Sequence, residues 1–566
     1  MKISLKVYVA ACWAGLFCCL LPQAAGAVTR YVVAYSVNPS APYLTVDTAA
    51  RSIQTAVNAS SPGDEIYVLP GTYAEGGAVI LGQQVSNRVV LTNSVTVIGL
   101  DGADYTTIVG GNPAGESGIR CVYMTAGSQL IGFTVMQGGT RIGAGSWSPD
   151  YSGGGIFMDG GGSVSDCTIY TNMAGFGAGI FCASGEVVNC RILTNIAVNA
   201  PGAGGGVYCA AGGQVSQCTI QGNRGAYGGG VFCDEDGLVE DCSIRQNRSS
   251  QNAGGVFCAS NGLVRSCQVS GNYAFKYGGG SYCWKGGDIR NALVLTNMAN
   301  QGGGVYLDRG GQLQSCTVSR NSGTTAGGGL YSWFTGAVWN TIIYQNSSGY
   351  GSNYACMGDG PQYSHSCLAP LPINNQEGCF ASNPNFERQG NYRLSGSSPC
   401  IDKGTNQAWM LLALDMDRRP RIWINTVDIG AIESNPANLM EDTDADHIPD
   451  AWEWQYYGHV TNVTPFFDSD GDACGAFAEF IAGTDPHSAS SFFGMANTRK
   501  VQANNVLTWP SVEGRVYTLH RTTNLMNEVA GAPLAIDLPA TPPLNCYTDA
   551  LATARCNIYI LRVKKP

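Results

Sequence analysis

Two short acidic segments near the carboxyl end hold the residues whose types and spacing most clearly allow chemistry. In the first, acidic residues stand at relative positions 1, 3, 5, 9 and 12, and position 7 offers a backbone carbonyl. Calcium prefers oxygen ligands, and this spacing is that of a calcium-binding loop. The candidate ligands of this first loop are Asp442, Asp444, Asp446, the carbonyl of Ile448, Asp450 and Glu453.

The second segment repeats the spacing at positions 1, 3, 5 and 12, with the candidate ligands Asp468, Asp470, Asp472 and Glu479. Both loops lack glycine at position 6, where His447 and Ala473 stand, and the second has Ala476 at position 9. Carboxylates this close repel one another until a hard cation neutralises them, so we expect structural calcium that stiffens the segment. A solvated acidic linker without calcium is the alternative.

The loops follow a block of eight repeats, each 24 to 27 residues long, from Gly153 to Asn346. Each unit reads Gly-Gly-(Ile/Val)-aromatic-Cys, then a turn, then Val-x-x-Cys-x-(Ile/Val)-x-x-Asn. The units contain no apolar stretch with helical spacing, whereas segments such as Ile180-Phe181-Cys182 alternate with the period of a short strand. The first and third of these three positions are expected to point inward. Two or three strands per unit then form one coil of a right-handed parallel β-helix.

The closing asparagine of each unit fits the same stack of coils. A polar side chain pointing inward at a coil corner can bond to its equivalents above and below, which satisfies amides that are costly to bury unpaired. We therefore predict an asparagine ladder and assign none of its members to catalysis. The members are Asn172, Asn195, Asn223, Asn247, Asn272, Asn297, Asn321 and Asn346.

The chain has 22 cysteines, and half of them fall at two repeat positions. Met158, Leu307 and Ser332 replace cysteine at the first position, and Ala292 and Thr341 replace it at the second. A site that accepts such residues is a packing site, so we interpret both rows as small buried side chains. A stack of disulfides is the alternative, because in-register neighbours have Cα atoms within bridging range but poorly aimed side chains.

The amino-terminal segment predicts export. Residues 1–27 carry two lysines, an apolar run and the small-residue site Ala25-Gly26-Ala27, which is the pattern of a secretory signal cleaved before Val28. The rest of the chain has no apolar stretch of membrane-spanning length. With 31 basic and 41 acidic residues and no basic cluster in the sequence, nucleic acid and anionic lipid are not expected partners. Neutral polar surfaces of this kind commonly bind sugars or other proteins.

Several segments outside the repeats resemble known modules. Apolar residues with helical spacing in 48–57, followed by Pro62-Gly-Asp64, a strand and Pro70-Gly-Thr-Tyr73, resemble the amino-terminal cap of pectin-lyase-like β-helix proteins. The motifs Ser398-Pro-Cys-Ile-Asp402 and Val427-Asp-Ile-Gly430 are similar to the closing segment of bacterial surface proteins of the choice-of-anchor group. The first resemblance implies a pectin-lyase-like fold, and the second implies a place at the cell surface.

The carboxyl end carries two further resemblances. The paired acidic loops, with Glu479-Phe-Ile-Ala-Gly-Thr-Asp-Pro486, resemble calcium-binding thrombospondin type 3-like linkers. The strand patterns around Trp509-Pro-Ser511 and Tyr559-Ile-Leu-Arg-Val563 resemble fibronectin type III-like modules, in which Cys546 and Cys556 flank the last hairpin and could pair. The expected divisions are 1–27 signal, 28–140 cap and first coils, 141–350 repeats, 351–436 last coils and closing segment, 437–491 calcium-binding linker and 492–566 β-sandwich.

β-Helices also host polysaccharide lyases and hydrolases, so catalysis needs its own test. A polygalacturonase-like hydrolase needs Asn-Thr-Asp, Asp-Asp and Gly-His-Gly, and the sequence contains none of the three. A lyase needs a basic residue beside calcium-binding acids. The cluster Asp234-Glu-Asp236, with Arg245 and Arg248 further on, is interpreted as a solvated turn rather than such a site, and no catalytic residue is assigned.

The sequence thus predicts an all-β protein: a right-handed parallel β-helix, then a calcium-loop linker and a small β-sandwich. The expected function is adhesion or polysaccharide binding without catalysis, by a secreted or cell-surface protein whose partner is a polysaccharide or a cell-surface ligand. The alternative is a polysaccharide lyase or glycoside hydrolase that acts on acidic glycans.

Overall fold

The computed structural model describes residues 7–8 and 27–565, with gaps at 112–113, 144–147, 199–201, 210, 374–375, 389, 423–425, 435–441, 443, 458–462, 502–503, 523–532 and 551–557. Apart from residues 7, 8 and 27, the predicted signal segment lies outside the described residues. The chain divides into two compact units, one of residues 23–434 and the other of residues 1–22 and 435–566. In the described residues, no helix combines the length and apolar character needed to cross a membrane.

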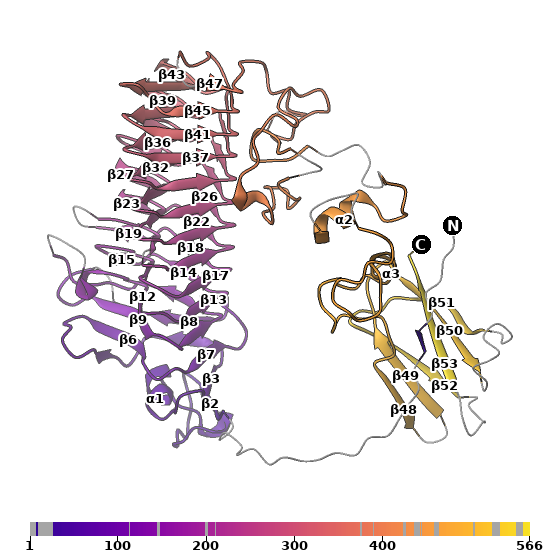
Figure 1. Cartoon of the computed structure of the whole chain (residues 1–566). Helices are drawn as coiled ribbons and strands as arrows, with labels where there is room; N and C mark the ends of the chain where they lie inside the picture. Colours follow the sequence, from indigo (N-terminus) through magenta and orange to yellow (C-terminus); the bar gives the residue numbers. More distant parts are fainter. Residues whose placement is uncertain are drawn as a thin grey trace. The chain divides into compact units, whose positions relative to one another are not determined.

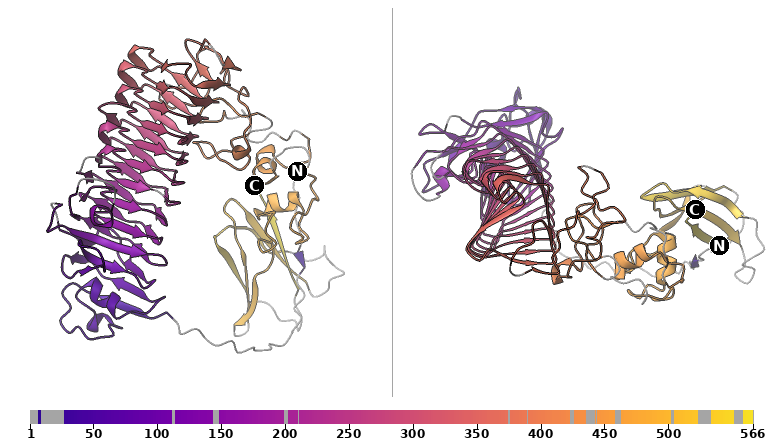
Figure 2. Two further views of the ribbon diagram at one scale, coloured as in Figure 1. Left: turned by 60° about the vertical axis from the view of Figure 1, so that its left-hand side comes forward. Right: turned by 90° about the horizontal axis from the view of Figure 1, so that it is seen from above.

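The larger unit is a parallel β-helix whose coils stack along one axis (Figures 1 and 2). One coil consists of β12 (Ile156–Asp159), β13 (Ser163–Ser165), β14 (Thr168–Tyr170) and β15 (Met173–Ala174), and the next coil begins with β16 (Ile180–Cys182). The central coils therefore have four strands, where the sequence predicted two or three. The extra strand forms because the short segment after the closing asparagine also pairs with its neighbours above and below.

Equivalent strands form four sheets, which we number in the order that one coil visits them. Sheet 1 has 12 strands and sheet 2 has 14. Sheet 1 comprises β5 (Ala78–Val79), β6 (Ser86–Leu91), β9 (Ile119–Thr125), β12, β16, β20 (Val207–Cys209), β24 (Val231–Cys233), β28 (Val256–Ala259), β32 (Ser281–Trp284), β36 (Val305–Asp308), β40 (Leu330–Trp333) and β44 (Tyr354–Met357). Sheet 2 comprises β2 (Thr29–Val32), β3 (Glu65–Val68), β7 (Thr96–Gly99), β10 (Gln129–Ile131), β13, β17 (Glu186–Val188), β21 (Gln214–Ser216), β25 (Leu238–Glu240), β29 (Leu263–Arg265), β33 (Asp288–Arg290), β37 (Gly311–Gln314), β41 (Gly336–Trp339), β45 (Gln362–Ser364) and β47 (Gln376–Glu377).

Sheets 3 and 4 meet at the corner that bears the asparagines. Sheet 3 comprises β4 (Gly71–Tyr73), β8 (Thr106–Val109), β11 (Thr134–Met136), β14, β18 (Arg191–Leu193), β22 (Thr219–Gln221), β26 (Ser243–Arg245), β30 (Gln268–Ser270), β34 (Leu293–Leu295), β38 (Thr317–Ser319), β42 (Ile342–Tyr344) and β46 (Cys367–Leu368). Sheet 4 comprises β15, β19 (Ile196–Ala197), β23 (Arg224–Tyr227), β27 (Arg248–Asn252), β31 (Tyr273–Ala274), β35 (Met298–Gln301), β39 (Ser322–Ala326) and β43 (Ser347–Tyr350).

The inside of the coils is filled by the rows that the repeats predicted. The first and third strand positions of sheet 1 point inward, as Ile180 and Cys182 show with no exposed surface. Both cysteine rows are buried, which confirms that they are packing positions, and burial raises the pKa of the Cys316 thiol to about 12. The first row is Cys182, Cys209, Cys233, Cys258 and Cys283, and the second is Cys167, Cys190, Cys218, Cys242, Cys267 and Cys316.

The predicted asparagine ladder is confirmed at the corner between sheets 3 and 4. The Asn247 side chain donates to Asn272 Oδ1 at 3.0 Å and to the Ile220 carbonyl at 2.9 Å. Its own Oδ1 accepts from the backbone N–H of Asn223 at 2.9 Å. The same pattern runs through the other rungs, so each buried amide is satisfied by the coils on either side. The ladder leaves the residues just before and after each asparagine facing outward.

A second apolar row lies on the outer face of sheet 1. Its aromatic rings stack with centroids 4.7 to 5.1 Å apart, coil after coil. Side chains from the ends of the sheet 4 strands and the segments after them, such as Tyr227 and Phe176, pack against this row. The outer face of sheet 1 is therefore covered by protein. The stacked residues are Phe157, Phe181, Tyr208, Phe232, Phe257, Tyr282, Tyr306 and Tyr331.

Both ends of the solenoid carry additional structure. The predicted amino-terminal helix is α1 (Ile53–Asn58), which Ser52 caps by accepting from Thr55 N–H, and short 3₁₀ turns lie at η1 (Val46–Thr48) and η2 (Pro149–Tyr151). Residues 384–434, which include η3 (Ala408–Met410), form the closing segment. This segment packs on the outer face of sheet 3, where Leu295 joins a cluster with Tyr392 and Ile432. It thus covers only the later coils of sheet 3.

The smaller unit contains two helices and two small antiparallel sheets. The helices are α2 (Asp450–Tyr457) and α3 (Ala476–Ala482). Trp509 and Leu507 of one sheet share a buried core with Tyr517, Leu519 and Leu561 of the other, which agrees with the predicted small β-sandwich. Cys546 is exposed, and its suggested partner Cys556 lies outside the described residues. The sheets are β48 (Asn497–Val501), β49 (Asn504–Pro510) and β52 (Leu544–Asp549), and β1 (Val7–Tyr8), β53 (Ile558–Lys564), β50 (Val516–Thr522) and β51 (Pro533–Pro539).

Candidate metal centre and surface groove

The first acidic loop brings its aspartates together. Ligand oxygens of Asp442, Asp444 and Asp446 all lie within 4.8 Å of one another. Asp442 accepts hydrogen bonds from the backbone N–H groups of Asp446 at 3.0 Å and His447 at 2.8 Å, which curls the loop around its first carboxylate. Asp450, the ligand candidate at position 9, is the first residue of α2 and is buried. Three of the candidate ligands of the first loop therefore lie close together.

Glu453 lies on the first turn of α2, at position 12 of the loop. Its side chain has no exposed surface, and neither of its carboxylate oxygens has a hydrogen-bond partner in the described structure. Desolvation by burial, together with the nearby charges of Asp446 and Asp444, raises its pKa to about 8. A buried carboxylate without partners is unfavourable unless a cation or a proton neutralises it.

The second acidic loop has the same construction. Ligand oxygens of Asp468, Asp470 and Asp472 also lie within 4.8 Å of one another. Asp468 accepts from Gly471 N–H at 2.7 Å and from Ala473 N–H at 2.9 Å. Glu479 has no exposed surface, its Oε2 has no described partner, and burial followed by the charges of Asp470 and Asp472 raises its pKa to about 7. In each loop, one buried glutamate is therefore near enough to the clustered aspartates for their charges to raise its pKa.

The missing glycines at position 6 do not prevent the turn. His447 and Ala473 adopt left-handed backbone angles, with φ of +75° and +72°. This conformation is the one for which glycine is usually selected, so both loops accept some backbone strain at the same position. In both loops the helix begins at position 9, which is Asp450 in the first and Ala476 in the second.

The two loops share a small hydrophobic core. Ile448 of the first loop packs with Ala476 and Phe480 of the second, and Trp452 meets Phe480 edge-on with ring centroids 5.9 Å apart. Arg515 of the sandwich donates to the carbonyls of Ile481 at 2.7 Å and Phe480 at 3.0 Å at the end of α3. The loops are therefore a paired element anchored on the sandwich.

The donor set of both loops suits a hard cation. Six buried carboxylate oxygens in the two loops have no described hydrogen-bond partner: Asp446 Oδ2, Glu453 Oε1 and Oε2, Asp470 Oδ2, Asp472 Oδ2 and Glu479 Oε2. Unpaired buried oxygens of this kind are the ligands that calcium takes. The residues present thus fit calcium, with the Ile448 carbonyl as a further donor in the first loop.

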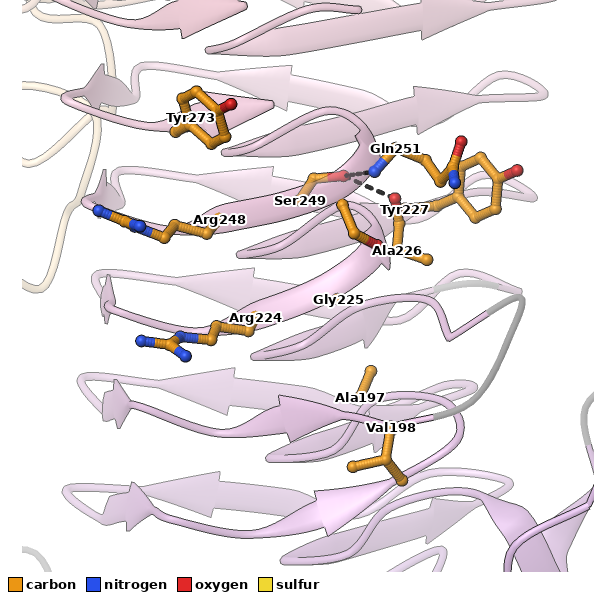
Figure 3. A pocket seen from close by; sticks show the side chains of 11 residues that line it. Ala197, Val198, Arg224, Gly225, Ala226, Tyr227, Arg248, Ser249, Gln251 and Tyr273 are labelled. Carbon is orange, nitrogen blue, oxygen red and sulfur yellow. Dashed lines mark hydrogen bonds between the residues drawn. The ribbon is translucent and has the colours of Figure 1, made fainter. Parts of the chain in front are cut away.

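A separate candidate site lies on the solenoid, along the corner between sheets 3 and 4. Three neighbouring cavities of about 750, 670 and 610 Å³ lie there, and Arg248 lines all three. Arg224 is common to two of them and Tyr273 to another two, so the cavities form one groove that we call the corner groove. Figure 3 shows Arg224, Arg248 and Tyr273 on successive coils beside it.

The two walls of the corner groove follow from strand register. One wall is formed by the first residues of the sheet 4 strands, where Ile196 pairs with Arg224, Arg224 with Arg248 and Arg248 with Tyr273. The other wall is formed by the last residues of the sheet 3 strands, where Gln221 pairs with Arg245. Hydrogen bonds form within each wall. In the sheet 3 wall, Arg245 donates to Gln221 Oε1 at 3.0 Å. In the sheet 4 wall, Ser249 accepts from Gln251 N–H at 3.0 Å (Figure 3).

The lining of the corner groove is basic. It contains no aspartate, glutamate or histidine among the described residues of the three cavities. It does contain five arginines, and none of them forms an ion pair in the described structure. The arginines are Arg191, Arg224, Arg245, Arg248 and Arg320.

Sequence reasoning missed this groove because its arginines are spread over four coils. No run of basic residues marks the groove in the sequence, although Arg224 and Arg248 each follow a ladder asparagine directly. The acidic residues that the sequence placed near Arg245 and Arg248 lie elsewhere: Asp234 to Asp236 occupy the turn between β24 and β25, with Glu235 and Asp236 exposed. The position after the asparagine in each repeat is the signal that could have identified the groove.

A family model described as "Right handed beta helix region" matches residues 154–348. Among solved structures, the crystal structure of pectate lyase Pel9A is similar at 15% sequence identity, covering 72% of this chain and 98% of that chain, with a TM-score of 0.34. No curated protein matches this chain. The chain is therefore an all-β protein built on a right-handed parallel β-helix.

Proposed function

We propose that this protein is an exported, non-catalytic polysaccharide-binding protein, secreted or held at the cell surface, that binds its ligand along the corner groove. The observation that carries the proposal is the continuous groove across successive coils, lined by side chains of arginine, tyrosine, glutamine, serine and threonine. Such side chains offer many hydrogen-bond donors and an aromatic face, which suits a hydroxyl-rich polymer. The signal-like residues 1–27 support export.

The composition of the groove favours binding over turnover. Hydrolysis of a glycosidic bond uses a pair of carboxyl groups, and elimination uses a base beside calcium-binding acids. The described lining of the corner groove supplies arginines but no carboxylate for either arrangement. A lyase or hydrolase would therefore have to use another surface of the solenoid.

We further propose that the paired acidic loops bind two structural calcium ions. The ligands in the first loop would be Asp442, Asp444, Asp446, Asp450, Glu453 and the carbonyl of Ile448, and in the second Asp468, Asp470, Asp472 and Glu479. The ions would supply positive charge to the buried glutamates of both helices. Support comes from the buried, unpartnered oxygens of Glu453 and Glu479.

The test is a binding and turnover screen of the mature chain, residues 28–566, against acidic and neutral polysaccharides, with calcium and with chelator. Binding would be measured by co-sedimentation or calorimetry. Turnover would be measured as reducing ends and as absorbance of unsaturated product. Binding without product is the expected result, whereas product release from a bound polysaccharide would overturn the non-catalytic proposal.

A further inference from the structure

The strongest unexplained feature of the solenoid is a set of arginines without counter-charges. Elsewhere on the solenoid, arginines usually have an acidic partner: Arg265 lies 2.6 Å from Glu240, and Arg290 lies 2.5 Å from Asp288. The five arginines of the corner groove have no such partner in the described structure. The whole chain carries a formal charge of −10, so this local excess of positive charge is not a general property of the surface.

Without a bound anion, the in-register placement of the groove arginines is electrostatically unfavourable. Arg224 and Arg248 occupy paired positions on adjacent strands of sheet 4, about 4.8 Å apart along the axis. Like charges in register on neighbouring strands repel each other. An ordinary solvated face mixes charges of both signs, which would remove this repulsion. A groove lined by one sign of charge instead favours an anion from outside.

The closing segment leaves this stretch of the corner open. In the coils that it covers, the outward residues of sheet 3 are apolar or small, as with Leu295 against Tyr392 and Thr317, which accepts from Ala431 N–H at 3.1 Å. In the coils immediately before them, the corresponding residues Gln221, Arg245 and Ser270 are polar or charged, and Gln221 and Arg245 line the groove. One coil earlier, Leu193 stands at this position. The outward side chains of sheet 3 therefore change from polar or charged to apolar or small where the closing segment begins to cover the sheet.

The chemistry of the exposed side chains matches acidic sugar units. Guanidinium groups form two parallel hydrogen bonds with carboxylate or sulfate oxygens, and repetition from coil to coil suits a ligand with a charge on each repeating unit. The Arg248 guanidinium lies 5.9 Å from the centre of the Tyr273 ring, so charge and an aromatic face occur side by side (Figure 3).

We infer that the corner groove selects anionic polysaccharides, with Arg224, Arg245 and Arg248 binding successive carboxylate or sulfate groups. This inference rests on the proposed function and adds the chemical class of its ligand. A surface that binds neutral glycans would need no arginines without ion-pair partners. The outer face of sheet 1 is covered by protein, so it is not open to a ligand in this way.

The experiment compares matched polymers that differ only in charge. The full mature chain is titrated with polygalacturonate and its methyl ester, and with dextran sulfate and dextran, at two salt concentrations. Single-stranded DNA serves as a polyanion without acidic sugar units. We expect binding of the acidic member of at least one pair, weaker binding of its neutral partner by roughly tenfold or more, and loss of affinity with salt.

Two double variants locate the binding. R224Q/R248Q removes two groove arginines, and R265Q/R309Q removes the same charge from other faces of the solenoid. The groove variant should lose roughly tenfold or more in affinity for the acidic polymer, whereas the control should stay within about twofold. Thermal unfolding of both variants confirms that they remain folded, since all four side chains reach the surface.

The outcomes separate the inference from the proposed function. Equal binding of charged and neutral partners would overturn the anionic selectivity but leave polysaccharide binding standing. Unchanged affinity in R224Q/R248Q would overturn the assignment to the corner groove. DNA bound as tightly as the acidic polysaccharides would show a general polyanion surface and contradict the inference. Failure of every polysaccharide to bind would overturn both the inference and the proposed function.

Discussion

Arg224 and Arg248 lie in register on adjacent strands of sheet 4, each directly after an asparagine of the buried ladder, and no described acidic residue forms an ion pair with either. The ladder holds the backbone on one side of the corner, and the arginines face solvent on the other. The rigid asparagine stack therefore sets the spacing of the exposed charges. A ligand bound along the corner would meet a preorganised row.

Asn247→Ala should destabilise the solenoid by about 2 to 3 kcal/mol, because it removes the acceptor of the buried Asn223 N–H and leaves that donor unsatisfied. The measurement is urea unfolding followed by far-ultraviolet circular dichroism. Gln268→Ala, at an exposed position of β30, is the matched control and should change stability by no more than about 0.5 kcal/mol. Equal stability of the two variants would contradict the role given to the ladder.

Calcium should stabilise the smaller unit and not the solenoid. At a calcium concentration a hundredfold above the dissociation constant, binding contributes about 2.7 kcal/mol per site. Differential scanning calorimetry with calcium, with magnesium and with chelator should show one transition that shifts with calcium alone. Glu453→Gln should weaken the shift, while Glu513→Gln, at an exposed position of the same unit, should leave it unchanged. A transition insensitive to chelator would argue for a calcium-free linker.

Without calcium, the smaller unit should lose stability as pH rises from about 5 to 8. Glu453 has a folded-state pKa of about 8 against an ordinary value of 4.5, so in this range the folded state binds a proton that the unfolded state has released. Its contribution is complete below the unfolded pKa and disappears as pH passes the folded pKa. Thermal melts across this range with chelator, for the wild type and Glu453→Gln, provide the measurement. A flat profile in the wild type would contradict the burial of this carboxyl group.

The cysteine rows should be unreactive thiols in the folded protein. Burial raises the pKa of Cys316 to about 12, and the core cysteines have almost no exposed surface, whereas Cys356 and Cys546 are exposed. A thiol reagent should label these two residues promptly and the core rows only after unfolding, with sites identified by mass spectrometry. Disulfide-linked peptides between neighbouring coils would instead support a stack of disulfides.

The repeat pattern was enough to predict the coil, because each position recurs in register. The inward Ile180 and Cys182 and the rungs of the ladder could be assigned from one unit and extended to the rest. The fourth strand could not be predicted, because it is only two to five residues long and forms through pairing between coils. The burial of the aromatic row could not be predicted, because it depends on where side chains such as Phe176 and Tyr227 lie once the coils stack.

The clustering of the aspartates in the acidic loops could be predicted from the sequence, but the packing that supports the loops could not. Spacing alone identified Asp442 to Asp446 as a cluster. The burial of Glu453 depends on Ile448 packing with Phe480, a residue of the other loop. The corner groove could not be predicted from the sequence, because Arg224 and Arg248 are 24 residues apart in the chain and become neighbours only after the coils stack.

The most direct test of ligand binding in the corner groove is protection of its arginines from chemical modification. Residues 28–566 would be treated with phenylglyoxal with and without saturating polygalacturonate, and the modified residues would be quantified by mass spectrometry. Bound polymer should protect Arg224, Arg245 and Arg248 and leave exposed Arg388 on the closing segment reactive. Equal modification of all four residues with polymer bound would contradict binding in the corner groove.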